Sequence, residues 1–176
     1  ALSLLEGLEG EDVLETRFEI HLARRSWGAL RRELRELKGD EALMWRCRVG
    51  SAMSEIHAAP VCAQAREVHG DMPELVAAHV VALARDRRVS EAEELAREHL
   101  AAHPNETVLY DALVGILEKA GWMREAVEVL EQWYASEVSS DHVKLRLGAA
   151  LVSKGKGDLV QGRAEEAKKT FLRGLE

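Results

Sequence analysis

The sequence has little of what β-sheet proteins, disulfide frameworks and membrane spans require. Three prolines and two phenylalanines occur among its 176 residues, and runs of β-branched residues are scarce, so the composition favours helices over strands. The two cysteines, Cys47 and Cys62, do not make a disulfide framework, and we expect each to be a small buried residue of a helix. No uninterrupted apolar run approaches the roughly 20 residues that a membrane-spanning helix needs.

Positive charge is also in short supply. The formal net charge is −7, which argues against nucleic acid as the main partner because phosphate binding needs clustered positive charge. No secretory signal is visible, and we expect a cytoplasmic protein. The chain begins with Ala1 instead of Met, which would suit a fragment of a longer protein.

Helical periodicity, in contrast, is abundant and is clearest between residues 105 and 134. One apolar stripe at helical spacing is formed by Leu109, Leu113, Ile116 and Leu117. Gly121 then suits the left-handed residue that closes a helix. A second stripe follows from residue 123 and contains Ala126, Val127, Val129, Leu130 and Trp133. Neither helix can bury its stripe alone, so each must pack on the other and on neighbouring pairs.

The same helix pair recurs at a constant spacing. Ala92 and Ala126 occupy matching places in two second helices and are 34 residues apart. Steps of the same length from Thr107 lead back to Pro73 and forward to Asp141, and both of these residues open further apolar helices. A period of 34 residues with two helices in each unit resembles the tetratricopeptide repeat.

This resemblance implies an all-α fold, an α-solenoid of about five antiparallel helix pairs wound into a right-handed superhelix. The whole chain, 1–176, would be one repeat domain with pairs at about 10–38, 39–72, 73–106, 107–140 and 141–176. Ala167 follows Ala126 by 41 residues instead of 34, so the last pair carries seven extra residues. Because the glycines and charges of KGKGDLVQG are typical of turns, we expect these residues in a loop insertion at 154–162.

The resemblance also assigns the contacts between helices. It places small residues where helices cross closely, at Gly148 in a first helix and at four alanines in second helices, Ala29, Ala92, Ala126 and Ala167. Trp133 would oppose the small residues Gly148 and Ala149, because a large side chain facing small ones conserves volume. We therefore expect Trp133 to be mostly buried between the last two pairs.

First helices of such repeats line a groove that commonly holds a peptide or a helix of a partner. The resemblance assigns this lining to Phe18, Leu43, Ala77, Val81, Asp111, Glu118, Leu145 and Val152. The surface would be mainly apolar, with an acidic patch at Asp111 and Glu118. The lysines and asparagines with which some family members clamp a chaperone's C-terminal carboxylate are missing at Ala77, Val81, Asp111 and Gly115. We therefore expect a non-catalytic protein-binding scaffold or adaptor whose groove takes an apolar helix or the protein's own terminal segment.

Two other functions stay open. The stretch from Val108 to Glu131 also resembles a pentatricopeptide repeat, whose arrays read single-stranded RNA, but Ala77, Asp111 and Leu145 stand where polar reader residues are expected. The second alternative is a structural subunit that self-associates through an uncapped terminal pair. No cluster of acid, base and nucleophile suggests an enzyme, and we expect no cofactor.

Three local features have both a structural and a functional interpretation. Trp122, at a turn, is either a local lid or an exposed anchor for a partner. His99 and His103 have a spacing that can bind zinc but lack an evident third ligand, so we expect no metal site. The basic cluster is either a solvated helix face, since Glu33 and Glu36 are interleaved, or a docking site for an acidic partner or nucleic acid. It comprises Arg24, Arg25, Arg31, Arg32, Arg35 and Lys38.

Overall fold

The computed structural model describes residues 11–53, 55, 57–136 and 140–174. These residues form ten α-helices with short connections and contain no strand, which confirms the all-α prediction. The helices are α1 (Glu11–Ala23), α2 (Trp27–Glu36), α3 (Gly39–Met53), α4 (Ala58–His69), α5 (Pro73–Arg85), α6 (Val89–Ala102), α7 (Thr107–Ala120), α8 (Met123–Ala135), α9 (Asp141–Val160) and α10 (Ala164–Arg173). None of these ten helices is long and apolar enough to cross a membrane.

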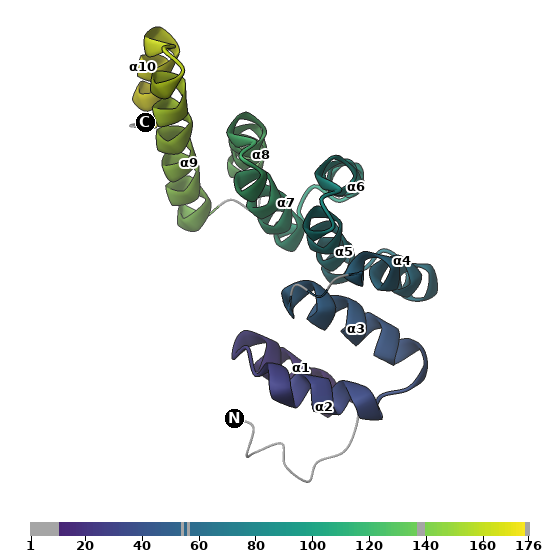
Figure 1. Ribbon diagram of the computed structural model, residues 1–176. Helices are drawn as coiled ribbons and strands as arrows, with labels where there is room; N and C mark the ends of the chain where they lie inside the picture. The colour runs from purple at the N-terminus through teal and green to yellow at the C-terminus, as the bar shows by residue number, and fades with distance from the viewer. Residues whose placement is uncertain (1–10, 54, 56, 137–139, 175–176) are drawn as a thin grey trace.

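The helices pack in sequence order and form an open array. Each of α3, α5, α7 and α9 packs against the helix that follows it, and α3, α5 and α7 also contact one another in a row. Figure 1 shows the pairs following one another along an arc, with α1 and α2 far from α9 and α10. An array of this kind exposes one face of every first helix unless another molecule covers it.

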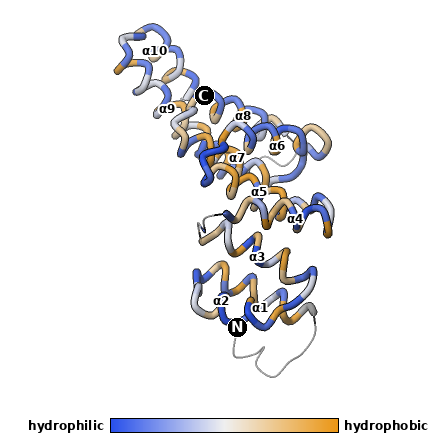
Figure 2. Tube along the Cα trace, turned by 45° about the vertical axis from the view of Figure 1, so that its right-hand side comes forward, coloured by the Kyte–Doolittle hydropathy of each residue, from blue (hydrophilic) through white to orange (hydrophobic). Residues whose placement is uncertain are grey.

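Two apolar clusters hold the array together. The main cluster runs from α3 to α9 and includes the fully buried Leu75, Leu109 and Leu113; Figure 2 shows hydrophobic stretches gathered at α5 and α7. A smaller N-terminal cluster consists of Phe18, Leu30, Trp45 and Val49, with half-buried neighbours around it. Both clusters include residues of α3, so this helix joins the first pair to the rest.

The predicted burial of Trp133 is confirmed, since only 5% of its surface is exposed. Its ring stacks on Tyr110 of α7, with ring centroids 5.5 Å apart and an interplanar angle of 9°. The turn between α7 and α8 closes at Gly121, whose φ of +79° is the left-handed conformation that the sequence predicts.

The predicted loop insertion at 154–162 is wrong. Helix α9 continues through the glycine-containing segment to Val160, and the turn is closed by Gly162. The extra residues therefore lengthen a helix by about two turns instead of forming a loop. Interactions specific to this site offset the poor helix propensity of glycine: Lys154 bonds Asp158 one turn ahead at 3.1 Å, and Arg163 of the turn donates to the same buried carboxylate.

The close helix crossing predicted at Gly148 lies at Gly155 instead. A Cβ atom added to Gly148 would have no heavy atom within 4 Å, whereas one added to Gly155 would lie 2.6 Å from the Phe171 ring of α10. Position 155 must therefore be glycine for Phe171 to pack where it does. This contact favours the helix despite the poor helix propensity of its glycines.

Replacing Gly155 by alanine is expected to destabilise the protein by about 1–3 kcal/mol, because the new methyl group overpacks against Phe171. Gly157→Ala is the matched control, since a Cβ there has nothing within 4 Å and alanine should stabilise the helix by about 0.5–1 kcal/mol. Urea denaturation of the two variants measures both changes. Equal stability of the two variants would contradict the proposed crossing.

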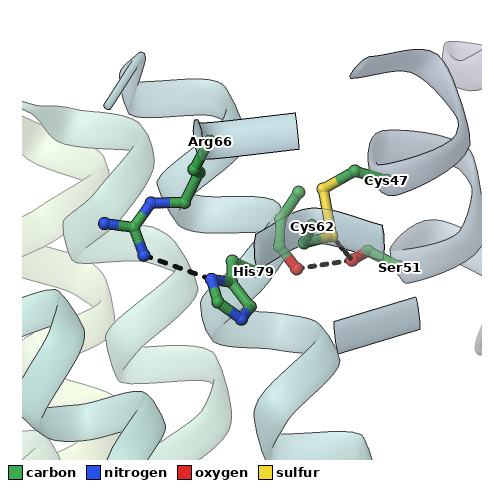
Figure 3. The surroundings of a disulfide bond; sticks show 6 residues. Cys47, Ser51, Cys62, Arg66 and His79 are labelled. Carbon is green, nitrogen blue, oxygen red and sulfur yellow. Dashed lines mark hydrogen bonds between the residues drawn. A yellow bond between two sulfur atoms is a disulfide. The ribbon is translucent and has the colours of Figure 1, made fainter. Parts of the chain in front are cut away.

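The expectation that Cys47 and Cys62 are separate thiols is wrong. Both are fully buried, as expected, but they form a disulfide between α3 and α4. Figure 3 shows this bond beside Ser51, whose hydroxyl donates to the carbonyl oxygen of Ala78 on α5. The sequence separation of 15 residues says nothing about pairing; the crossing of the two helices brings the Cα atoms within 4.6 Å.

Candidate functional site

A hollow of about 750 Å³ lies on the row of first helices, where the α1–α2 turn meets α3, α5 and α7. Small side chains create it, because alanines leave space where larger residues would fill the surface. Its lining includes Ala52, Ala77, Ala78, Val81 and Ala112. Leu22, Trp27 and Met53 add apolar surface near the α1–α2 turn.

A second hollow of about 480 Å³ adjoins the first. The two share Val81 and Arg85, and the second lies between the α5–α6 turn and the end of α7. Its apolar lining also includes Ala84, Val89, Ile116 and Ala120. We call the two hollows together the groove.

The structure brings together only part of the predicted groove lining. Ala77, Val81 and Asp111 line the first hollow. Leu145 and Val152 lie on α9 with exposed fractions of 75% and 39%, apart from the residues that line the two hollows. Leu43 is half-buried and packs against the main cluster. Of the predicted lining, the hollows thus include residues of α5 and the start of α7, but neither Leu43 of α3 nor the two residues of α9.

The assignment of Phe18 to the groove is wrong. Phe18 has no exposed surface and lies in the N-terminal cluster, where its ring centroid is 4.5 Å from that of Trp45. Leu22, four residues later on α1, lines the first hollow instead. Burial of a large aromatic ring stabilises the first pair more than exposure to a groove would.

The predicted acidic patch at Asp111 and Glu118 is partly neutralised by a cation that the sequence does not place there. Arg146 reaches from α9 to α7, donates to Asp111 and bonds Glu118 Oε2 at 3.0 Å. Burial alone would lower the pKa of Arg146, but the bonds to both carboxylates raise it above its ordinary value. One guanidinium thus binds two carboxylates, and its single positive charge offsets one of their two negative charges.

Cations without a carboxylate partner among the described residues surround the groove. Arg25 and Arg85 line the first hollow, and Arg85, Arg87 and Lys119 line the second. Arg48 also lines the first hollow, but it is paired with Glu19 and lies over the Trp45 ring, 4.6 Å from the centroid. The second hollow has no acidic residue in its lining.

Trp122 stands at the N-terminal boundary of α8, where it is half-buried and packs against the main cluster. This is the arrangement of a local lid over the end of the hairpin. The remaining surface of its ring lines a separate polar hollow beside α9. Trp122 could therefore present only part of its ring to a partner, and it does not protrude as an anchor.

The histidines do not assemble a metal site in the part of the chain that the structure describes. His99 and His103 lie with ring centroids 4.8 Å apart, but no group of three metal-ligating side chains is found there. His79 is buried near Arg66, whose guanidinium lies 3.2 Å from Nδ1 (Figure 3). Burial, followed by repulsion from Arg66, lowers the pKa of His79 to about 4, so its ring is neutral at pH 7.

In the basic cluster at the N-terminal end, one of the two interleaved acids is paired with an arginine outside the cluster. Glu33 turns inward and pairs with Arg17 at 2.6 Å. Arg31 pairs with Glu55 at 3.4 Å, although both side chains are largely exposed and such pairs contribute little. Arg25 alone of the cluster lines the groove.

Comparison of the chain with protein-family models, with curated proteins and with solved structures gave no match. A functional assignment therefore depends on the groove: its position on the first helices, its unfilled volume and the charges around it.

Proposed function

We propose that the protein is a non-catalytic interaction scaffold that binds a peptide segment or helix of a partner protein in the groove. The observation that carries this proposal is the hollow of about 750 Å³ on α3, α5 and α7, which the chain's own side chains leave unfilled. Protein interiors are close-packed, and an apolar hollow with polar groups at its edge is typical of a binding surface. The 34-residue helix pairs that resemble tetratricopeptide repeats support the same function.

Self-association through the last pair is a second candidate, favoured by one observation. Four large apolar side chains of α9 and α10 are highly exposed: Leu145 (75%), Leu159 (51%), Val160 (89%) and Leu172 (54%). Light scattering on the isolated chain tests this candidate. A monomer at high concentration would exclude it without affecting the groove.

The disulfide bears on the compartment in which the scaffold would act. Disulfides persist in oxidising environments and are rare in the cytosol. The bond between Cys47 and Cys62 therefore supports an oxidising compartment over the cytoplasm that the sequence suggested.

The proposal predicts that Val81→Glu weakens peptide binding. Val81 lines both hollows, and a carboxylate there would be desolvated by an apolar ligand, weakening affinity by about tenfold or more. Short random peptides displayed on phage and selected on the immobilised full chain provide ligands, and fluorescence anisotropy measures their affinity. Val160→Glu, on the exposed end of α9, is the matched control and should leave binding unchanged. Ligands that bind the Val81→Glu chain as tightly as the unaltered one would refute the groove as the binding surface.

A further inference from the structure

We infer that the groove selects acidic peptides, in which an apolar side chain is flanked by aspartate or glutamate. This inference rests on the proposed function, because it specifies which peptide the groove accepts. It also reverses the expectation from the sequence, in which Asp111 and Glu118 made the groove acidic. The reversal has two causes. Arg146 binds both carboxylates and offsets one of their two negative charges, and cations without a carboxylate partner among the described residues line the hollows.

The second hollow carries the strongest evidence. Its apolar lining of Val81, Val89 and Ile116 can hold an aliphatic or aromatic side chain. Three cations, Arg85, Arg87 and Lys119, line the same hollow. Among the described residues no acidic side chain lines this hollow, and none of the three cations is paired with a carboxylate. A ligand that fills the apolar part therefore places its neighbouring residues beside three cations. Carboxylates at those positions form charge-assisted hydrogen bonds, whereas lysine or arginine would be repelled.

The first hollow extends the same preference towards the α1–α2 turn. Arg25 and Arg85 both line this hollow, and neither has a carboxylate partner in the described part of the chain. Glu74 is the acid of this lining that has no cation partner among the described residues, and it stands against these two arginines. A peptide that crosses both hollows therefore meets Arg25, Arg85, Arg87 and Lys119. Against these four cations stand two carboxylates of the first hollow, Glu74 near the start of α5 and Asp111, which Arg146 binds.

The backbone supplies an independent observation. Four hairpin turns have a left-handed residue immediately before the N-cap of the second helix. Glycine occupies this place at Gly121 and Gly162, where it costs little, but arginine occupies it at Arg25 and Arg87, with φ of +53° and +63°. A side chain with a Cβ is disfavoured in this conformation. Both of these arginines line the groove. The two turns with an unfavourable backbone conformation are therefore those at which a cation would contact the ligand.

An acidic peptide fits these observations better than a nucleic acid does. Single-stranded nucleic acid binds on aromatic platforms, whereas the second hollow is lined by aliphatic side chains. Glu74 and Asp111 also line the first hollow, and the whole chain carries a net charge of −7, which would repel a long polyanion. A short acidic segment meets mainly the local cations, because salt screens charges beyond about 10 Å at 0.1 M ionic strength.

The test compares peptide selections on two forms of the full chain, unaltered and Arg85→Glu/Arg87→Glu. We expect selection from random displayed peptides on the unaltered chain to enrich aspartate and glutamate beside an apolar residue. The double variant should bind these peptides about tenfold or more weakly and should itself enrich lysine and arginine. Arg32→Glu/Arg35→Glu is the matched control, since these exposed arginines of α2 lie outside the groove lining, and it should keep the preference for acidic peptides.

A second variant separates binding from folding. Arg87→Gly removes the cation and relieves the left-handed residue, so it should unfold at higher urea than the unaltered chain while binding acidic peptides more weakly. A gain in stability with unchanged affinity would overturn the role of Arg87. If Arg85→Glu/Arg87→Glu also left peptide binding unchanged, the inference as a whole would be overturned.

The other outcomes distinguish this inference from the proposed function. Peptides that require Val81 but show no acidic enrichment would overturn the inference and leave the scaffold function standing. A selection without any Val81-dependent peptide would overturn both. A further outcome is that the unaltered chain binds single-stranded oligouridylate more tightly than any selected peptide, and loses this binding in Arg85→Glu/Arg87→Glu. That result would overturn the inference in favour of nucleic acid.

Discussion

Replacing Trp45 by alanine is expected to lower the free energy of unfolding by about 3–5 kcal/mol. Trp45 is fully buried, its ring centroid lies 4.5 Å from that of Phe18, and the guanidinium carbon of Arg48 lies over the ring, 4.6 Å from the centroid. The N-terminal cluster has few buried members, and Trp45 is the largest of them. Its truncation would leave a cavity that this small cluster cannot refill.

The position of Trp45 on α3 predicts how the variant unfolds. Because each pair of an array contacts mainly its neighbours, α1 and α2 should unfold at lower urea than the helices of the main cluster. Hydrogen exchange followed by mass spectrometry would show early exchange in residues 11–36. Trp45→Phe is the matched control: it keeps a ring and removes an indole N–H that has no partner among the described residues, so a loss below about 1.5 kcal/mol is expected. Equal losses in both variants would show that ring packing is not what holds the first pair.

Much of the helical pattern could be predicted from the sequence, because it depends on local chemistry. The hairpin of α7 and α8 is the clearest case: apolar residues recur at helical spacing on both sides of Gly121, and glycine suits the left-handed turn. Pro73 likewise opens α5 within its first turn, where its missing N–H has no intrahelical partner to lose. Such signals lie within a few residues of the element that they determine.

The end of α9 could not be predicted in this way, because its helix depends on contacts from another helix. Locally, the glycines and charges of residues 154–162 are typical of a turn. The helix forms because Gly155 admits the Phe171 ring, and because Asp158 binds both Lys154 and Arg163. Tertiary packing overrides a weak local preference here.

The electrostatics of the groove were mispredicted for the same reason. The sequence pattern places Asp111 and Glu118 one above the other on α7, but the cation that binds them stands on α9, 35 and 28 residues away. Phe18 was misplaced by one helical turn, since Leu22 lines the hollow. Which side of a helix faces a groove, and which charges meet there, depends on how pairs stack.

Breaking the Cys47–Cys62 disulfide is expected to lower the free energy of unfolding by about 3 kcal/mol, the value for closing a loop of about 15 residues in the unfolded chain. The variant Cys47→Ala/Cys62→Ala measures this change in urea without reductant. Domains of this kind are typically stable by only about 5–15 kcal/mol, so the loss should shift the transition clearly. Unchanged stability would mean that the bond adds nothing beyond the packing of α3 on α4.

Reductant provides the control for this prediction and connects it to the groove. Added dithiothreitol should lower the stability of the unaltered chain towards that of the alanine variant and leave the variant itself unchanged. Helix α3 carries Ser51 and Ala52, which line the first hollow, and Ser51 holds α3 to the Ala78 carbonyl of α5. A looser junction of α3 and α4 should therefore weaken peptide binding at urea concentrations well below global unfolding. Because the same bond stabilises the helix that lines the groove, a reducing environment would lower ligand affinity before it unfolds the array.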